Sequence, residues 1–402
     1  MLTKKQNEVY QSFLKENPKI LIASGAKRAG KTFALDLIFL NHIVKYRNKG
    51  VSFILGGATQ GSIRRNVLDD LEKILGKQLK LDKSNAVEIF GNKVYCFDGA
   101  KADSWKKVRG FTAAGAFLNE GTALHDTFVK EVIFRCSYEG ARIFIDTNPE
   151  NPAHSIKKDY IDKDGQQLKD GQINIRAFHF SLFDNTALGE EYIESIVMST
   201  PSGMFTDRDI DGRWVSAKGV VYKDFNHQKH YVKASNYEYL RYFAGVDWGY
   251  EHYGSIVVIG ETINHEFILV KEIAERHKEI DYWSEKAQEV KEEFGNINFY
   301  CDTARPEHIN RLINDGIRAR FAKKEVLSGI EEVAKRFKKN TLLIDNSVKR
   351  FREEINMYSW NEKTGEPVKL YDDVLDALRY AIYTDYVGDG KIRTINKKIL
   401  GV

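Results

Sequence analysis

The chain has 402 residues, 42% of them hydrophobic and 12% aromatic, with a formal net charge of only +4. This length predicts two domains that each bury a core, and 6 prolines without any low-complexity tract exclude extended disorder. No apolar run reaches the roughly 18–20 residues of a membrane span, the N-terminal segment lacks the apolar centre of a signal peptide, and the 3 scattered cysteines exclude a disulfide framework or a zinc cluster. We therefore expect a cytoplasmic protein.

The first half of the chain alternates short apolar segments with segments of helical periodicity. The first strand is predicted at 19–24 and the first helix at 31–47. Further strands are predicted at 51–57, 92–99, 114–120 and 141–149, with helices at 63–76 and 124–136. Such alternation predicts an α/β domain with a parallel sheet covered by helices, which we place at residues 1–214.

A phosphate-binding loop lies between the first predicted strand and the first predicted helix. The pattern G-x-x-x-x-G-K-[ST] is met by Gly25, Gly30, Lys31 and Thr32. In such a loop the backbone N–H groups bind phosphate oxygens, the lysine ammonium reaches the β and γ phosphates, and the threonine hydroxyl binds Mg²⁺. The flanking elements therefore favour binding of ATP or GTP. Lys27 and Arg28 either add positive charge near the γ-phosphate or face solvent.

Polar residues end two later strands of this domain. Asn119 and Glu120 follow an apolar strand, so Glu120 is the candidate base that activates water, and its alternative role is a helix cap or a surface carboxylate. Asn119 stands where a metal-holding aspartate is usual and contributes no charge. Thr147 and Asn148 end the next strand, where they either sense the γ-phosphate and couple hydrolysis to DNA or form an ordinary Asn-Pro turn.

A second series of strands begins near residue 242, after the periodicity breaks at 202–225. We predict a linker at 215–235, a second domain at 236–390 and a C-terminal tail at 391–402. The expected strands are 242–249, 254–262, 266–274, 297–304 and 341–346. The expected helices are 279–294, 306–315, 351–360 and 372–386, with a basic helical segment between 315 and 341. Three consecutive strands followed by alternating helices and strands predict a mixed sheet.

Aspartates gather at corresponding points of this second domain. Asp247 and Asp302 each end an apolar strand, and Asp376 shares one face of the last predicted helix with Asp372 and Asp373. Such carboxylates repel one another unless cations lie between them, and two divalent metals about 4 Å apart would activate a water and stabilise the leaving oxygen of a phosphodiester. This is the arrangement of an RNase H-like nuclease, although each aspartate alone equally suits a cap or a turn.

Several segments are rich in lysine and arginine, and most of them also contain an aromatic residue. They are 62–66, 104–110, 318–324, 334–340 and 348–353. A surface that follows the phosphates of DNA has this composition, but so does a solvated helix face.

Taken together, these motifs resemble the large terminase subunits of tailed double-stranded DNA bacteriophages. The resemblance covers nearly the whole chain and rests on "GAKRAGKT", "RGFTAAGAFLNEGT", "TNPENPAHSIKKDYID", "DGRWVSAKGVVYKDF", "VDWGY", "CDTARPE" and "DVLDALRYA", in that order. It implies an N-terminal P-loop ATPase domain of the RecA/ASCE type and a C-terminal RNase H-like nuclease domain.

The resemblance also implies a function and a set of partners. ATP hydrolysis with Mg²⁺ would drive double-stranded DNA through the portal protein into the procapsid, and a nuclease with two Mg²⁺ or Mn²⁺ ions would cut the concatemer. A small terminase subunit would recognise the packaging site. We expect a ring of copies on the portal, a monomer in solution and no membrane contact. The protein would act in the host cytoplasm, docked transiently on the procapsid, and be absent from the mature virion.

Residue roles follow from the same resemblance. ATP binding is expected from Gly25, Lys27, Arg28, Gly30, Lys31 and Thr32, and Gln6 is expected to recognise adenine. An N-terminal helix in which Gln6 has no such role explains this segment nearly as well. Glu120 would activate water, Thr32 would bind Mg²⁺, and Thr147 and Asn148 would couple hydrolysis to DNA movement. Asp247, Asp302 and Asp376 would be the catalytic ligands of the nuclease metals, with Asp373 as a further ligand or a proton carrier. The arginines that could stabilise the γ-phosphate are Arg28, Arg109 and Arg135.

Three other classes of protein share part of this pattern. A helicase or repair ATPase fused to a nuclease would also cut DNA, but the second half lacks the motor motifs of a second RecA-like core. A DNA-binding adaptor with a degenerate ATPase is suggested only by Asn119. A small-molecule kinase with a P-loop would leave the second domain unexplained.

Overall fold

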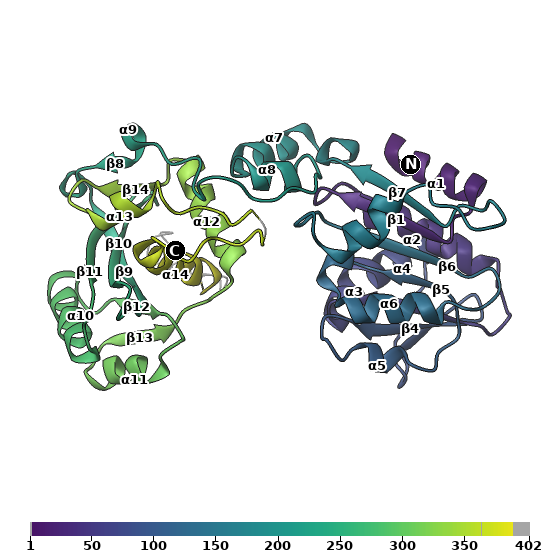
Figure 1. Cartoon of the computed structure of the whole chain (residues 1–402), viewed down its shortest axis with the longest axis horizontal. Coiled ribbons are helices and arrows are strands. Elements are labelled where there is room, and N and C mark those ends of the chain that lie inside the picture. The colour runs from purple at the N-terminus through teal and green to yellow at the C-terminus, as the bar shows by residue number, and fades with distance from the viewer. Residues whose placement is uncertain (1, 363, 389–402) are drawn as a thin grey trace, which may run out of the picture. The chain divides into compact units, whose positions relative to one another are not determined.

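The chain folds into two compact α/β units. The computed structural model describes residues 2–362 and 364–388, so the predicted tail at 391–402 lies outside the described residues. The first unit comprises Met1–Val197 and Met204–Ser216, and the second comprises Met198–Gly203 and Ala217–Val402. In each unit, helices pack against a central sheet (Figure 1).

The first unit is built on a seven-stranded sheet in the order β3-β4-β2-β5-β6-β1-β7. All neighbouring strands run parallel except β3 and β4. The strands are β1 (Ile20–Gly25), β2 (Ser52–Gly57), β3 (Ala86–Ile89), β4 (Asn92–Asp98), β5 (Ala113–Leu118), β6 (Arg142–Thr147) and β7 (Ile175–Phe180). The parallel order places the P-loop strand β1 beside β6, which separates it from β5.

Helices cover both faces of this sheet. They are α1 (Lys4–Glu16), α2 (Lys31–Val44), α3 (Gln60–Ile63), α4 (Asp69–Leu75), α5 (Trp105–Val108), α6 (Asp126–Arg135), α7 (Glu190–Ser199) and α8 (Met204–Asp209), with π-helices η1 (Arg64–Leu68) and η3 (Ile156–Tyr160) and 3₁₀ turns η2 (Gly121–Ala123), η4 (Ile161–Lys163) and η5 (Leu182–Asp184). Alternate residues of β1 enter different cores: Leu21 packs with α1 and α2, and Ile22 packs with α6. Because both faces are covered, the inner strands β1 and β5 are buried along their whole length.

Two strands of this sheet were not predicted from the sequence. β3 pairs antiparallel with β4 through the two-residue turn Phe90–Gly91, whose φ values of 50° and 72° give the twist of a hairpin. β7 (Ile175–Phe180) pairs with β1 at the other edge of the sheet. The first sheet is therefore mixed rather than wholly parallel, with a single antiparallel pair at one edge.

A buried histidine belongs to the core between α2 and the sheet. His42 is 1% exposed, its Nε2 lies 2.9 Å from the carbonyl oxygen of Ala114, and its ring packs edge-on against Phe53 and Phe144. Burial lowers the pKa of His42 to about 4, and the hydrogen bond to the backbone only partly opposes this shift. The ring is thus neutral at physiological pH.

The second unit has a seven-stranded mixed sheet in the order β13-β12-β9-β10-β11-β14-β8. The pairs β9–β10 and β10–β11 are antiparallel and the other pairs are parallel, so the sheet is mixed as predicted, although β8 and β13 were not among the predicted strands. The strands are β8 (Tyr231–Val232), β9 (Tyr239–Asp247), β10 (Gly254–Thr262), β11 (Phe267–Glu275), β12 (Asn298–Cys301), β13 (Arg318–Phe321) and β14 (Leu342–Asp345). The helices are α9 (His227–His230), α10 (Ile280–Phe294), α11 (Pro306–Asn314), α12 (Val326–Lys338), α13 (Arg350–Glu354) and α14 (Asp373–Gly388), with the 3₁₀ turn η6 (Ala234–Asn236).

Helix α14 lies directly against strand β9. A Cβ atom at Gly245 would lie 2.0 Å from the carbonyl oxygen of Ala377, so only glycine permits this approach. Gly245 comes two residues before Asp247, and Ala377 follows Asp376. The close approach therefore brings the acidic end of β9 next to the acidic turn of α14.

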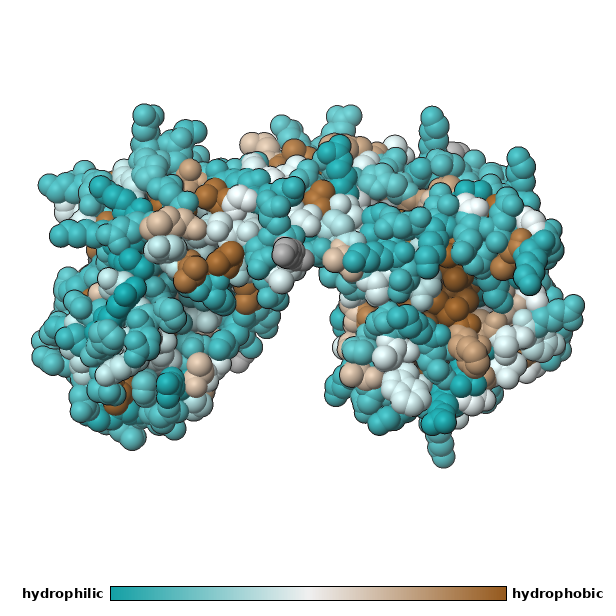
Figure 2. Space-filling model, viewed as in Figure 1, coloured by the Kyte–Doolittle hydropathy of each residue, from teal (hydrophilic) through white to brown (hydrophobic). Residues whose placement is uncertain are grey.

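Neither unit shows a membrane-spanning element in the part of the chain that the structure describes. No helix there is long and apolar enough to cross a bilayer. Figure 2 shows mainly hydrophilic residues on the visible face of each unit, with smaller apolar areas between them.

Candidate nucleotide and nuclease sites

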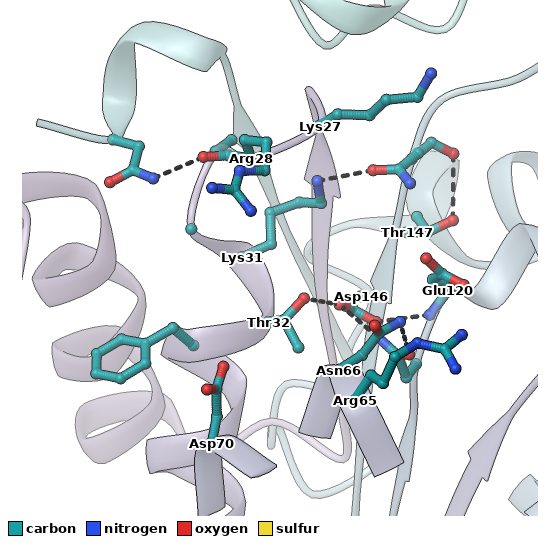
Figure 3. A pocket seen from close by; sticks show the side chains of 16 residues that line it. Lys27, Arg28, Lys31, Thr32, Arg65, Asn66, Asp70, Glu120, Asp146 and Thr147 are labelled. Carbon is teal, nitrogen blue, oxygen red and sulfur yellow. Dashed lines mark hydrogen bonds between the residues drawn. The ribbon is translucent and has the colours of Figure 1, made fainter. Parts of the chain in front are cut away.

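The P-loop begins where β1 ends, and its first glycine is required by close packing. Gly25 has φ 151°, and a Cβ atom there would lie 1.9 Å from the carbonyl oxygen of Phe180 on β7. The loop then turns into α2, whose first residues are Lys31 and Thr32. This strand, loop and helix form one wall of a cavity of about 530 Å³ (Figure 3).

The lysine of the loop is buried and held by oxygens. Nζ of Lys31 donates to the carbonyl oxygens of Gly25 (2.9 Å) and Ala26 (2.6 Å) and to Oδ1 of Asn148 (3.0 Å). Lys31 is 6% exposed, and burial lowers its pKa to about 8. Asn148, predicted as a coupling residue, thus contacts the P-loop lysine directly. Thr147 accepts a hydrogen bond from the backbone N–H of Thr122, just beyond Glu120.

The predicted water-activating residue faces the same cavity. Glu120 follows β5 with a left-handed backbone, φ 55° and ψ 57°, which is uncommon for a residue with a side chain. Burial, aided by the negative charge of Asp146, raises the pKa of Glu120. A carboxylate with a raised pKa beside a phosphate-binding loop is suited to accept a proton from water.

Two carboxylates that line this cavity, Asp70 and Asp146, were not predicted from the sequence. Asp146 near the end of β6 accepts hydrogen bonds from the Thr32 hydroxyl, from Nδ2 of Asn119 (3.0 and 3.1 Å) and from the backbone N–H of Glu120 (2.8 Å). Figure 3 shows Asp146 between Thr32 and Glu120. Asp146 was counted as part of an apolar strand, and only the pairing of β6 with β1 brings it to the P-loop.

Other predicted ATP-binding residues lie around the loop. Lys27 and Arg28 line the cavity; Nζ of Lys27 pairs with Asp209 at 3.0 Å, and the Arg28 guanidinium lies over the ring of Tyr192. Gln6 is 5% exposed, and its amide donates to the carbonyl oxygen of Gly30 (3.0 Å) while accepting from the N–H of Thr3. In the structure Gln6 therefore joins helix α1 to the P-loop, and adenine recognition stays a prediction.

Two arginines line the cavity: Arg28, which was among the predicted candidates, and Arg65, which was not. Arg109 lies over the ring of Trp105, and Arg135 pairs with Glu131 at 2.6 Å; neither lines the cavity. Arg65 does line it, and its positive charge opposes the rise in the pKa of Glu120. Its position depends on the π-helix η1 (Arg64–Leu68), a local feature common at functional sites that the apolar periodicity did not reveal.

The second unit brings all of its predicted acidic residues into one cavity. This cavity has about 530 Å³ and is lined by Asp247, Asp302, Asp372, Asp373 and Asp376, together with His252, Arg305, Lys324, Lys369 and Tyr380. Burial raises the pKa of Asp247 well above its ordinary value, and the neighbouring carboxylates of Asp376 and Asp302 add to the rise. Burial likewise raises the pKa of Asp372 to about 6. The cavity thus concentrates negative charge that a cation would stabilise.

Basic side chains already neutralise part of this charge. Nζ of Lys324 lies 2.6 Å from Oδ1 of Asp302, and Nζ of Lys369 lies 3.1 Å from Asp376 and 3.5 Å from Asp372. Within residues 2–362 and 364–388, no group of three or more His, Cys, Asp or Glu side chains has the geometry to hold a metal ion. Carboxylate oxygens are the donors that divalent cations prefer, but in this structure three of the carboxylates are paired with lysine ammonium groups.

A buried glutamate holds the start of helix α14 from outside the cavity. Glu354 is fully buried, and its Oε2 accepts from the backbone N–H groups of Val374 (2.9 Å) and Leu375 (3.2 Å). Its Oε1 accepts from Nε of Arg350 at 2.8 Å, and Arg350 also lies 3.5 Å from Asp373. Glu354 thus caps the helix that carries Asp376.

Comparison with known proteins identifies the family. The profile of the large terminase subunit, T4likevirus-type, N-terminal region, matches residues 22–229. The chain belongs to this terminase family. The large terminase of a thermophilic bacteriophage is similar over the full length: its complex with ADP is 28% identical, covers 97% of this chain and 100% of its own, and has a TM-score of 0.79. The complex of the same phage enzyme with ATP-γ-S is 27% identical, covers 96% of this chain and 99% of its own, and has a TM-score of 0.77. A search of curated proteins found no match.

Membership of the family confirms the resemblance and the enzyme activities that were predicted from the sequence. As a large terminase the chain is an ATPase and a nuclease, and its two units match a full-length enzyme of this kind. The predicted fold class, two α/β units each with a central sheet, is confirmed as well. The roles of individual residues, the metal ions and the partners are taken up as proposals below.

Proposed function

We propose that the first unit hydrolyses ATP with Mg²⁺ and that the resulting motion moves double-stranded DNA through a portal protein into a procapsid. The observation that carries this proposal is the gathering of Lys31, Thr32 and Glu120 around one cavity. The large terminase of the thermophilic phage, similar over the full length, has been solved with ADP and with ATP-γ-S, which supports a nucleotide in this place.

Each residue of the cavity has a defined task in this reaction. The Lys31 ammonium exchanges the carbonyl oxygens of Gly25 and Ala26 for phosphate oxygens. Glu120 orients the attacking water and accepts its proton. Mg²⁺, held by Thr32, neutralises phosphate charge when it is bound. Asn148 loses its hydrogen bond when Lys31 turns to the phosphate, and its movement shifts the loop that follows Glu120.

Steady-state ATP hydrolysis tests the first half of the proposal. Lys31→Ala should abolish nucleotide binding and hydrolysis because the main positive charge of the loop is lost. Lys83→Ala, which removes an exposed lysine outside the cavity, is the matched control and should leave hydrolysis unchanged. Equal hydrolysis by both variants would refute the assignment.

We propose further that the second unit cuts concatemeric DNA, at the start and at the end of packaging, with two Mg²⁺ or Mn²⁺ ions. Asp247, Asp302 and Asp376 would hold the ions, with Asp373 beside them. The ions activate a water and stabilise the leaving oxygen when they are bound. Lys324 and Lys369 release their carboxylates at that stage and face the phosphates of DNA from the rim of the cavity.

Plasmid cleavage in Mn²⁺ tests the nuclease assignment. Asp302→Asn should abolish cleavage, because it removes a charged ligand while keeping the shape of the side chain. Asp281→Asn, an exposed acid on α10 outside the cavity, should cut as the parent does. A parent that does not cut, or an Asp302→Asn variant that cuts equally well, would overturn the assignment.

The expected assembly belongs to the same proposal. The protein acts on double-stranded DNA with a portal protein and a small terminase subunit, as a ring on the portal and as a monomer in solution, in the host cytoplasm and not in the mature virion. Sedimentation of the isolated chain with and without portal tests this: a ring that forms without portal would contradict it.

A further inference from the structure

A buried carboxylate stands beside the P-loop threonine on a strand where none was expected. Asp146 is 3% exposed and lies on β6, between the P-loop strand β1 and the strand β5 that leads to Glu120. It is paired in register with Ala23 of β1. Its Oδ2 accepts a hydrogen bond from the Thr32 hydroxyl, and the side chain reaches the wall of the cavity.

The neighbouring amide is complementary to this carboxylate. Nδ2 of Asn119 donates to both oxygens of Asp146, at 3.0 and 3.1 Å, while its Oδ1 accepts from Asn66 at 3.1 Å. An aspartate at 119 would place a second buried carboxylate about 3 Å from the first, and the two negative charges would repel each other. Asn119 and Asp146 therefore form a hydrogen-bonded pair. The carboxylate of the pair is on β6, one strand nearer to the P-loop, and an amide occupies position 119, where a carboxylate is usual.

We propose that Asp146, with Thr32, holds the Mg²⁺ that accompanies ATP and so replaces the carboxylate that Asn119 lacks. This assignment rests on the proposed ATPase function. Three observations favour it: the hydrogen bond to Thr32, the contact with the cavity, and the amide that keeps the carboxylate oriented. Asp146 is thus a metal-holding residue, while Glu120 keeps the role of accepting the proton from water.

The alternative is that Asp146 only stabilises the fold by linking the start of α2 to the residues that follow β5. Both roles predict some loss of stability when Asp146 is changed, but only the metal role predicts a loss of Mg²⁺ dependence in nucleotide binding. The informative quantity is therefore the ratio of the Kd for ATP-γ-S in EDTA to the Kd in Mg²⁺, measured by isothermal titration calorimetry on the full chain.

Two variants and one control separate these roles. Asp146→Asn keeps the shape and removes the charge. The exchange Asn119→Asp with Asp146→Asn moves the carboxylate back to its usual strand. Asp36→Asn is the matched control: Asp36 on α2 is fully buried in the same unit, does not line the cavity, and its oxygens have no hydrogen-bond partner among the described residues.

The expected results are distinct. Asp146→Asn should lower the Kd ratio by about 10–100-fold, the usual effect of removing a group that supports a bound metal. Asp36→Asn should keep the parent ratio, and the exchange variant should recover at least about 10-fold relative to Asp146→Asn. Thermal melting in EDTA checks that each variant is folded. If Asp146→Asn does not fold, the exchange variant decides: a ratio near the parent's supports the assignment, and the loss of Mg²⁺ dependence overturns it.

Two outcomes overturn the assignment on its own. One is a folded Asp146→Asn protein with the parent ratio, and the other is an exchange variant that stays at the level of Asp146→Asn. If the parent chain binds no ATP-γ-S, or binds it as well after Lys31→Ala, the proposed ATPase site itself is wrong and the assignment of Asp146 falls with it.

Discussion

Removing either lysine from the nuclease cavity should tighten metal binding. Nζ of Lys324 lies 2.6 Å from Oδ1 of Asp302; the lysine side chain is 46% exposed and the aspartate side chain is 8% exposed. A metal that binds Asp302 must first displace this ammonium group. The pair is partly solvated, so its net contribution is about 1 kcal/mol rather than the full Coulomb energy. Since about 1.4 kcal/mol corresponds to tenfold, Lys324→Ala should lower the Kd for Mn²⁺ about 5-fold.

Lys369→Ala should act in the same direction by about 2–5-fold, because its side chain is 65% exposed and its contacts of 3.1 and 3.5 Å are longer. The assay is calorimetric titration of the full chain with Mn²⁺ in the absence of nucleotide and DNA. Lys323→Ala is the control, since the exposed Lys323 has no ion pair among the described residues and does not line the cavity. Unchanged or weaker Mn²⁺ binding by Lys324→Ala would refute the reasoning, whatever happens to plasmid cleavage.

Three further predictions concern single residues. Arg65→Ala should lower kcat for ATP hydrolysis about 100-fold or more by removing positive charge from the cavity, whereas Arg64→Ala, whose guanidinium pairs with acids outside the cavity, should not; equal kcat values would contradict the role of Arg65. The pKa of His42 is about 4 in the folded state and about 6.5 in the unfolded state, so the unfolded chain binds a proton first as the pH falls. The free energy of unfolding, measured with urea, should therefore drop by about 2–3 kcal/mol from pH 7 to 4.5. His42→Gln should lack this part of the pH dependence. Glu354→Ala should destabilise the second unit by about 1–3 kcal/mol, because the backbone N–H groups at the start of α14 lose their buried acceptor and Arg350 loses one of its three acidic partners. Glu354→Gln should cost less because its amide oxygen still caps α14; equal melting of the two variants would show that the cap contributes nothing.

The sequence predicted the residues whose role follows from their place along one element. The P-loop depends on one short run of positions between a strand and a helix, and Asp247 and Asp302 follow apolar strands. These local signals suffice because the ends of neighbouring strands meet at one edge of a sheet. The same signals located Asp376, since its helical spacing from Asp373 can be read directly.

The residues that were missed depend on contacts between distant segments. Asp146 becomes visible only when β6 pairs with β1, and Arg65 reaches the cavity only through the π-helix η1. Lys324 and Lys369 meet their carboxylates from segments without regular periodicity, so no pattern places them. Burial also raises the pKa of Glu120 and of Asp247, and burial depends on the fold rather than on the sequence motif.

The contact between Gly245 and Ala377 has an evolutionary consequence. Because backbone touches backbone there, α14 cannot shift along β9 without opening a void in the core, so the spacing of Asp247 and Asp376 is inherited from packing. Any substitution that weakens this packing should therefore also disturb the spacing of the two carboxylates, so this contact is constrained twice. The two lysines that pair with the acidic residues have side chains that are 46% and 65% exposed, and they are free of that constraint.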